Sequence, residues 1–301
     1  MKKLLYIFLL LGGTYSCVEE DMETRDTRIL YDWSSDAHQP ADGMALRLFP
    51  EDGSIPLAFR TNNEGYTGGR LPADSYQALA FNTEVEGVEL TDTTDYEGAM
   101  AHALPQEGMP LIDGLPLMRP VGWLYAAYDG ALRVTSAVGT EEHHLAVHPL
   151  SAHIQVNITN LTSTPLDSVR CLLRGLVLSR QLCGGTAHFD EGMGAYRLEE
   201  AFDADGRAAG VVPCLGVYNP NPTGSLLRYD NLCTLDLIFP SHVVVRKEIS
   251  LSEQLVEAMG GDDLSVAIAI NLKLEGDLGG NLHVDVNVSP WEAGDEIHWG
   301  V

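Results

Sequence analysis

Alternation of apolar and polar residues with a period of two recurs along the chain and restricts its fold more than any other feature. The segment 264–274 alternates leucine, valine and isoleucine with serine, alanine, asparagine and lysine, and segments 282–288, 154–159 and 44–48 repeat the pattern. Successive side chains of a strand point to opposite faces, so this period predicts antiparallel sheets with one polar face. Clusters of glycine, proline, aspartate and asparagine separate the strands, which indicates β-sandwiches.

Helix signals are few. The best one covers Ser252–Met259, where Ser252 is a candidate cap and two glycines follow. Between Thr83 and Leu117 the periodicity is weak and several prolines occur, which predicts a long loop with short elements. The 301 residues are enough for two domains. We place the boundary near His148, with one β-sandwich domain at 28–147 and a second at 148–301.

The N-terminus has the arrangement of a processed export signal. Lys2 and Lys3 precede the apolar run Leu4–Leu11, which is roughly half of the length needed to span a bilayer. Ser16-Cys17 resembles the bacterial lipobox, so residues 1–16 are the predicted signal peptide and Cys17 the predicted lipidation site. Acyl chains, such as palmitate, on one cysteine hold a protein firmly to a membrane. An ordinary secretory signal with an incidental cysteine is the alternative.

Residues 17–27 are the predicted lipidated tether. The acidic stretch Val18–Glu23 resembles the signal that sends Bacteroidota lipoproteins to the outside of the outer membrane, and it also suits a solvated linker. We therefore expect a lipid-anchored outer-membrane protein that is exposed on the cell surface. Arg25 and Arg28 are interpreted as charges of the tether.

The acidic balance of the chain limits its partners. The formal net charge is −25, and the acidic residues are spread through turns rather than gathered in one block. Such a surface repels phosphate backbones, which makes a nucleic-acid partner improbable, and it repels anionic lipid as well. The acyl group is then the expected membrane attachment.

Four cysteines follow the lipobox, all in the C-terminal half: Cys171, Cys183, Cys214 and Cys233. In an oxidising compartment an even number permits two disulfides, with three possible connectivities. The alternative is that cysteine serves here as a small buried hydrophobic residue. No CxxC pair occurs, so the sequence gives a zinc site no support.

No motif in the sequence predicts catalysis, a metal or a cofactor. The histidine cluster consists of His143, His144, His148 and His153, and its spacing does not match H-E-x-x-H. We expect these histidines to face solvent or to be hydrogen-bonded, with His153 on a polar strand face. The segment Asp203–Gly206 lacks the remaining acidic positions of a calcium loop, which favours a polar turn. The sequence contains no G-x-S-x-G and no assignable carboxylate pair.

Two short segments resemble the O-glycosylation sequence of exported Bacteroidota proteins. They are Asp92-Thr93-Thr94 and Asp167-Ser168-Val169, which makes Thr93 and Ser168 the candidate glycosylated residues.

Several longer segments carry a resemblance to a known family. They are Arg28-Ile29-Leu30-Tyr31-Asp32-Trp33-Ser34, Leu46-Arg47-Leu48-Phe49-Pro50 with Asp52-Gly53, Leu71-Pro72-Ala73-Asp74-Ser75-Tyr76, Phe81-Asn82, and Val284-Asp285-Val286-Asn287-Val288-Ser289-Pro290-Trp291. Together they are similar to the poorly characterised Bacteroidota lipoproteins that include the fimbrillin-associated anchor and accessory subunits of type V pili.

The resemblance implies two transthyretin-like β-sandwich domains and a role in a surface fimbrium, its anchorage or cell adhesion. It also implies fimbrillin-like partner subunits that join by adding a strand of one chain to a sheet of another. An open sheet edge offers unpaired N–H and C=O groups for such pairing. The candidate contributing segments are Asp295–Val301 and Arg28–Trp33.

Two other functions are weighed against this one. A surface glycan-binding lipoprotein for nutrient capture is the alternative, in which Trp123, Tyr125 and Tyr128 stack on sugar rings. Packing of these aromatic residues in the core is the competing explanation. A hydrolase is the least favoured, because no nucleophile and base can be named.

Overall fold

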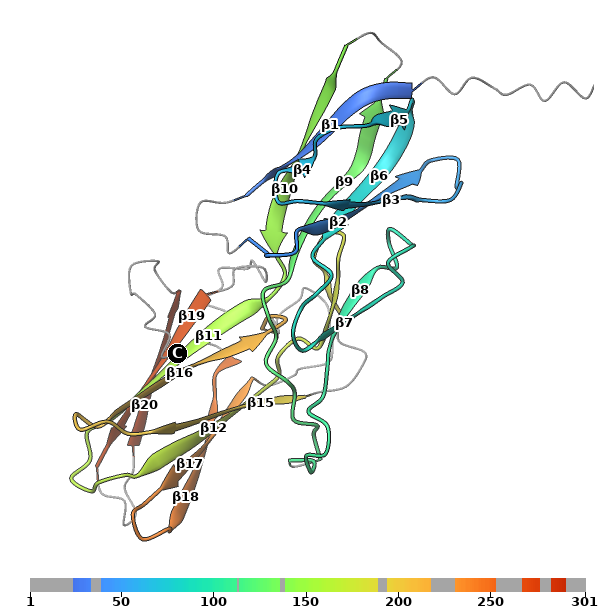
Figure 1. Cartoon of the computed structure of the whole chain (residues 1–301). Helices are drawn as coiled ribbons and strands as arrows, with labels where there is room; N and C mark the ends of the chain where they lie inside the picture. The colour runs from blue at the N-terminus through green and yellow to red at the C-terminus, as the bar shows by residue number, and fades with distance from the viewer. Residues whose placement is uncertain are drawn as a thin grey trace, which may run out of the picture.

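Strands form almost all of the regular structure of this protein. The computed structural model describes residues 24–33, 39–112, 114–135, 139–188, 194–217, 231–252, 267–276 and 283–290. Within these ranges twenty strands, β1 to β20, are arranged in four sheets (Figure 1). The predicted all-β class is confirmed. Beyond Ser252, the predicted helix Ser252–Met259 lies outside the described residues, and the ranges above contain no helix suited to crossing a membrane.

The first sheet contains eight strands from the N-terminal half of the chain. They are β1 (Thr24–Asp32), β2 (Met44–Pro50), β3 (Leu57–Thr61), β4 (Gly65–Tyr66), β5 (Arg70–Pro72), β6 (Asp74–Phe81), β9 (Tyr125–Val134) and β10 (Glu141–Pro149). Their order is β3-β2-β6-β9-β10-β1-β4, and β5 also pairs with β1. The alternation at 44–48 has its expected effect, because Met44, Leu46 and Leu48 are buried in the core that this sheet encloses.

Two four-stranded sheets form a sandwich in the C-terminal half. One has the order β16-β11-β19-β20, with β11 (Ala152–Asn160), β16 (Arg207–Cys214), β19 (Ala267–Glu275) and β20 (His283–Pro290). The other has the order β15-β12-β17-β18, with β12 (Ser168–Arg174), β15 (Ala195–Ala201), β17 (Leu232–Ile238) and β18 (Val244–Ser250). Ile154 and Val156 on β11 and Leu235 on β17 are fully buried in one core that these two sheets share.

The fourth sheet joins the two halves of the chain. It consists of β7 (Val88–Thr91), β8 (Met100–Ala103), β13 (Ser179–Gln181) and β14 (Ala187–His188), in the order β14-β13-β8-β7. β7 and β8 are the short elements expected in the segment Thr83–Leu117. Because β8 pairs with β13, this sheet contains strands from both sides of the predicted boundary near His148, and that boundary stays a prediction.

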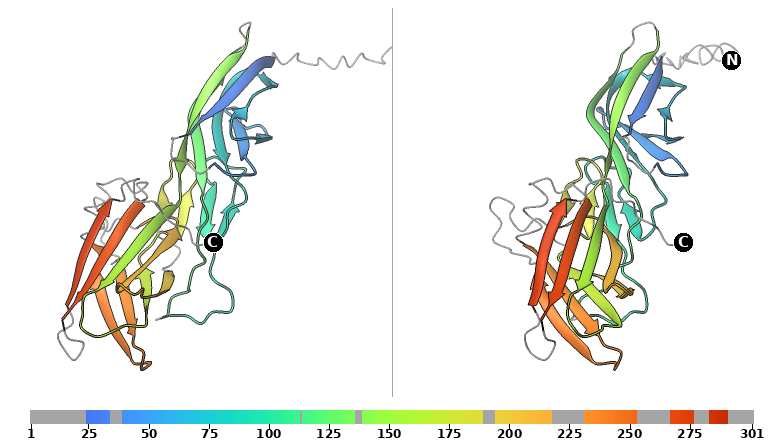
Figure 2. Two further views of the ribbon diagram at one scale, coloured as in Figure 1. Left: turned by 60° about the vertical axis from the view of Figure 1, so that its left-hand side comes forward. Right: turned by 90° about the vertical axis from the view of Figure 1, so that its left-hand side faces the viewer.

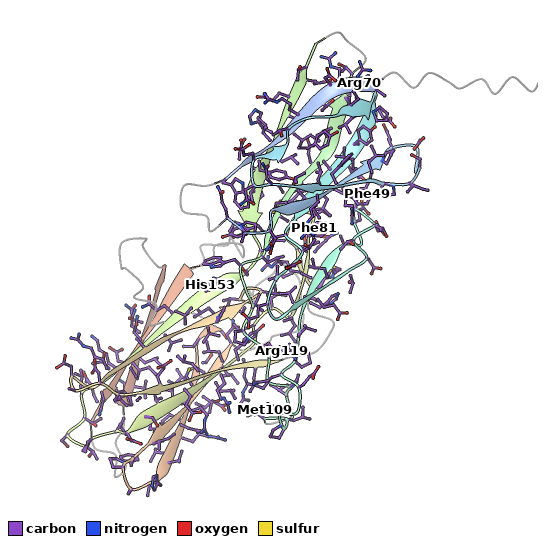
Figure 3. The ribbon with its side chains drawn as sticks, in the orientation of Figure 1. Phe49, Arg70, Phe81, Met109, Arg119 and His153 are labelled. Atoms are coloured by element: carbon purple, nitrogen blue, oxygen red, sulfur yellow. The ribbon has the colours of Figure 1, made fainter. Side chains whose placement is uncertain are left out.

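The molecule is elongated, with the first sheet at one end and the sandwich of the two four-stranded sheets that contain β11 and β12 at the other (Figures 1 and 2). Phe81 lies where the first sheet meets β7 and β8 (Figure 3), in the same core as Ala99 and Ala101. β1 begins at the end of the molecule that lies far from the sandwich (Figure 1).

Candidate functional site

Strand β1 is the first described element after the predicted tether, and both of its edges are paired. On one side it runs parallel to β10, with partners from Thr27↔Glu141 to Asp32↔Ala146. On the other side it pairs antiparallel with β4 and β5. Because β1 and β10 are far apart in sequence, their pairing is a long-range contact within the first sheet.

The inward face of β1 is anchored in the core of the first sheet. Ile29 is fully buried, and Tyr31 is nearly so. The Tyr31 hydroxyl donates to Thr61 Oγ1 at 2.9 Å, and the Thr61 hydroxyl donates to the Met44 carbonyl at 3.0 Å. Burial raises the pKa of Tyr31 to about 12, although the hydrogen bond with Thr61 acts to lower it. Just beyond β1, Trp33 Nε1 donates to the carbonyl of Asn63 at 2.7 Å.

A first ionic group joins β1 to β10 near the start of the strand. Arg25 Nε lies 3.5 Å from Glu141 Oε2, and His143 Nε2 lies 3.7 Å from Glu141 Oε1. The N–H and the hydroxyl of Thr135 both donate to Glu141. Burial acts to raise the pKa of Glu141, but the Thr135 hydrogen bonds and the charges of His143 and Arg25 together lower it.

A second ionic group lies on the exposed face of the same strand pair. His144 Nδ1 is 3.0 Å from Asp32 Oδ1, and His144 Nε2 is 3.2 Å from Glu142 Oε1. Arg28 Nη1 lies 3.5 Å from Glu142 Oε2. Hydrogen bonds to Asp32 and then Glu142 raise the pKa of His144. Each β1 cation therefore faces a β10 carboxylate, and these groups support the parallel pairing.

Two sequence-based interpretations of this segment are wrong. Arg25 is not a tether charge, because it is 9% exposed within β1 and is ion-paired with Glu141. Arg28 also belongs to β1. The stretch Arg28–Trp33 is not a free contributing strand, since residues up to Asp32 are paired with β10 of the same chain. The other candidate segment, Asp295–Val301, lies outside the described residues.

The four cysteines are buried free thiols, and two of them are neighbours. Cys171 on β12 and Cys233 on β17 have sulfurs 3.3 Å apart. Burial raises the pKa of Cys214 to about 12 and also raises that of Cys183. Because the sulfurs of Cys171 and Cys233 are neighbours, the connectivity that links these two residues is the one that the geometry favours. A disulfide itself stays a prediction.

The four histidines lie in separate surroundings. His143 and His144 belong to the two ionic groups, whereas the ring of His148 lies 5.5 Å from that of Tyr128. His153 lies on the face of β11 opposite Ile154 and Val156, as expected, but it is 6% exposed and its ring lies 3.7 Å from that of Trp123. It lies near the end of the sandwich that is closer to the first sheet (Figure 3).

The aromatic residues of the glycan alternative are mainly part of the core. Tyr125 is buried between Trp33 and Trp123, with ring centroids 5.3 Å and 6.1 Å away. Trp123 packs on the core of the first sheet, and Tyr128 packs on the core of the second half. Core packing, the competing explanation, therefore accounts for these three rings.

The remaining predicted positions fall in varied places. Asp203 Oδ1 accepts hydrogen bonds from the N–H groups of Asp205 and Arg207, as expected for a polar turn. Thr93 is half-buried in the connection between β7 and β8, and Ser168 begins β12. Both remain candidates for glycosylation. Cys17 lies outside the described residues.

Strand β18 offers an open edge that the sequence patterns did not single out. Among the described strands it pairs only with β17. Val243 and Val244 at its start are 56% and 52% exposed. Arg246 ties the strand to β17 by donating to both carboxylate oxygens of Asp236, at 2.7 and 3.0 Å, and this lowers the pKa of Asp236. The edge is thus held in place, and within the described residues no strand pairs with its outer backbone groups.

Comparison with known protein families assigns the chain to one of them. Residues 16–183 match DUF5119, a domain of unknown function. The protein belongs to the DUF5119 family. This match begins at the predicted lipobox and includes the first sheet and strands β7, β8, β11, β12 and β13. No curated protein matches this DUF5119 chain.

Solved structures of Bacteroidota surface proteins share the fold of this DUF5119 protein. The fimbrial anchor protein Mfa2 from Porphyromonas gingivalis is 12% identical, with a TM-score of 0.59 over 89% of this chain and 98% of Mfa2. A candidate adhesin from Bacteroides ovatus is 13% identical, with a TM-score of 0.59 over 81% of this chain and 90% of the adhesin. A candidate polysaccharide-binding protein (DUF1812) from Bacteroides thetaiotaomicron is 9% identical, with a TM-score of 0.56 over 90% and 100%. The predicted likeness to fimbrial anchor and accessory proteins is confirmed at the level of the fold.

Proposed function

We propose that this DUF5119 protein is a cell-surface lipoprotein that serves as the anchor or a minor accessory subunit of a fimbrium. The observation that carries the proposal is the fold shared with the fimbrial anchor protein Mfa2 over nearly the whole of both chains. The predicted lipobox, with Cys17 as its lipidated residue, supplies the membrane attachment. No enzymatic step is part of this function.

The position of β1 supports an anchoring role. A lipidated tether before Thr24 passes any pulling force directly into β1. That strand is paired on both edges, buried on its inner face and joined to β10 by the ionic groups described above. The tether is then residues 17–23, four residues shorter than the sequence alone suggests.

The open edge of β18 supports subunit joining by strand addition. An added strand from a partner subunit would pair with the outer N–H and C=O groups of β18. Exposed Val243 and Val244 would supply apolar contact, while Arg246, Lys247 and Glu248 along the strand discourage unspecific pairing. In this scheme the first sheet is the domain near the membrane, and the C-terminal sandwich that contains β18 is the domain that meets the partner.

Filament purification tests this proposal. Surface filaments are sheared from cells and analysed by quantitative mass spectrometry, with wild-type protein and a Cys17→Ala variant. We expect the wild type to stay with the cell envelope and to copurify with fimbrillin-like subunits when filaments are extracted with detergent. The variant should shed filaments into the medium. Absence of the wild-type protein from every filament preparation would contradict the proposal. A Cys183→Ala variant controls for loss of a cysteine.

A further inference from the structure

A groove of about 830 Å³ lies on the first sheet, away from β1 and β18. Along β6, Tyr76, Ala78 and Ala80 point into the core of the first sheet. The alternate residues Leu79 and Phe81 point the other way and are covered by the core of the second half. Gln77 and Ser75 on that same outer face lie beyond this cover, and they form part of the groove floor. The volume is within the usual range of about 300–1,000 Å³ for small-ligand sites.

A β-bulge shapes the floor. The pairing of β6 with β9 shifts between Tyr76↔Leu132 and Ala78↔Asp129, so Gly130 and Ala131 together oppose the single residue Gln77. Bulges of this kind re-aim side chains and are frequent beside binding sites. A Cβ on Gly130 would have the Tyr96 hydroxyl oxygen as its nearest neighbour, at 3.8 Å. The small residues of the bulge therefore leave open space on the part of the groove floor that lies opposite Gln77 in the strand pairing.

Hydrogen-bonding groups of both kinds line the groove without partners of their own. Gln77 and Arg133 supply donors, and Glu51 supplies acceptors. Within the described part of the chain, the structure gives these three side chains no hydrogen bond or ion pair. Donors and acceptors that line one partly enclosed space suit a ligand rich in hydroxyl groups.

An aromatic wall completes the groove. Tyr96, from the connection between β7 and β8, is half-buried, and its ring lies edge-on to Phe49 with centroids 5.8 Å apart. Burial, followed by nearby groups including Asp129, raises the pKa of Tyr96 to about 12, so its hydroxyl keeps its proton. The ring supplies apolar contact, and the hydroxyl supplies one more donor.

The excess of acidic over basic side chains in the groove excludes anionic ligands. Glu51, Asp95 and Glu97 outnumber Arg133, and the whole chain carries −25. This field repels phosphorylated, sulfated and carboxylated ligands. Strand β6 on the groove floor offers no edge to an extended peptide, because β2 pairs with it on one side and β9 on the other.

We propose that this groove binds a neutral oligosaccharide, with Gln77, Arg133 and Glu51 as hydrogen-bonding residues and Tyr96 as the aromatic wall. The site is independent of the anchoring role proposed above. It would let a filament-associated protein hold a glycan on a surface that neither the tether nor the β18 edge occupies.

The test uses the full mature chain on an array of neutral plant and microbial oligosaccharides, with acidic glycans and a lysine-rich peptide for comparison. The dissociation constant for each neutral glycan bound is then measured for three variants. Ala131→Trp fills the groove. Ala58→Trp is the matched control, because Ala58 is exposed on β3 of the same sheet and does not line the groove. Gln77→Ala removes one hydrogen-bonding group without adding bulk.

We expect neutral glycans to bind, with affinity reduced about tenfold or more in Ala131→Trp and Gln77→Ala and unchanged in Ala58→Trp. Equal near-ultraviolet circular dichroism of the variants confirms that they are folded. The proposal is overturned if no neutral glycan binds, if only the acidic glycans or the peptide bind, or if both groove variants bind as wild type.

Discussion

A buried arginine illustrates how single residues hold the connections of this fold. Arg180 on β13 is 1% exposed. Its Nε donates to the Leu215 carbonyl at 2.8 Å, and its Nη1 donates to the Gly185 carbonyl. Both carbonyls lie in connections between strands, where no sheet ladder satisfies them. The guanidinium therefore supplies donors to backbone groups that would otherwise be costly to bury.

Replacement of this side chain should destabilise the protein substantially. We expect Arg180→Ala to lower the free energy of unfolding by about 3 kcal/mol, because two buried acceptors lose their donor and a cavity remains. Urea denaturation of the full chain measures the change. Arg60→Ala is the control, since the Arg60 side chain is 69% exposed, and it should change stability by less than about 0.5 kcal/mol. Similar losses in the two variants would contradict this role.

His144 should make the pairing of β1 with β10 weakly dependent on pH. Its pKa is raised in the folded protein by Asp32 and Glu142, so its contribution to stability is fully present below the ordinary histidine pKa of about 6.5. The contribution disappears as the pH rises through the raised pKa. His144→Gln should therefore cost more stability near about pH 5.5 than near about pH 9. The effect is small because the group is exposed to solvent.

Two measurements check this expectation. A proton NMR titration of the imidazole of His144 should give a midpoint above the usual histidine value. Denaturation of wild type and variant at both pH values should give the larger difference on the acidic side. A variant that is equally destabilised at the two pH values would show that protonated His144 does not stabilise the strand pair.

At the scale of elements, β1 should protect its own arginines from proteolysis. In the folded chain the bond after Arg25 lies where β1 pairs with β5, and the bond after Arg28 lies where β1 pairs with β10. Trypsin should cut there only when β1 opens, so Ile29→Ala, which removes a fully buried side chain, should speed the cleavage. Mass spectrometry of limited digests follows each site. Leu30→Ala, at a half-buried position of the same strand, is the control. Rapid cleavage of the wild type at Arg25 would contradict this account.

Local alternation predicted the strands well but could not predict how they pair. Met44, Leu46 and Leu48 of β2 and Ile154, Val156 and Ile158 of β11 are buried as the period of two requires. The parallel contact of β1 with β10 depends on residues more than a hundred positions apart, and no local pattern records it. The same holds for Cys171 and Cys233, whose proximity arises from the register of β12 with β17.

The groove was also beyond sequence analysis, for a related reason. The groove lies beside the part of the first sheet whose outer face is packed against the core of the second half. Where that packing ends depends on the placement of β7 and β8. The bulge at Gly130 within β9 depends on the register of β9 with β6, which no local pattern records. Alternation assigned His153 to the correct face of β11, opposite Ile154 and Val156, but could not predict that Trp123 from another segment covers it.

At the scale of the whole molecule, the two features that an anchor needs lie at opposite ends. β1 begins at one end of the elongated molecule, and the open edge of β18 belongs to the sandwich at the other end (Figures 1 and 2). A protein held by its N-terminus would present this edge away from the membrane. The fourth sheet, with strands from both halves, connects the two ends.

The most direct test of this account is site-specific photo-crosslinking on intact cells. A photoreactive amino acid is placed at Val244 on the β18 edge, or at Leu161, which is 55% exposed and lies outside the described strands. We expect Val244 to crosslink a fimbrillin-like subunit through residues of one of its strands, while Leu161 gives little of this product. Joining through the β18 edge would be contradicted if Val244 gave no crosslink to a fimbrial subunit. It would also be contradicted if Val244 and Leu161 gave equal amounts of that crosslink.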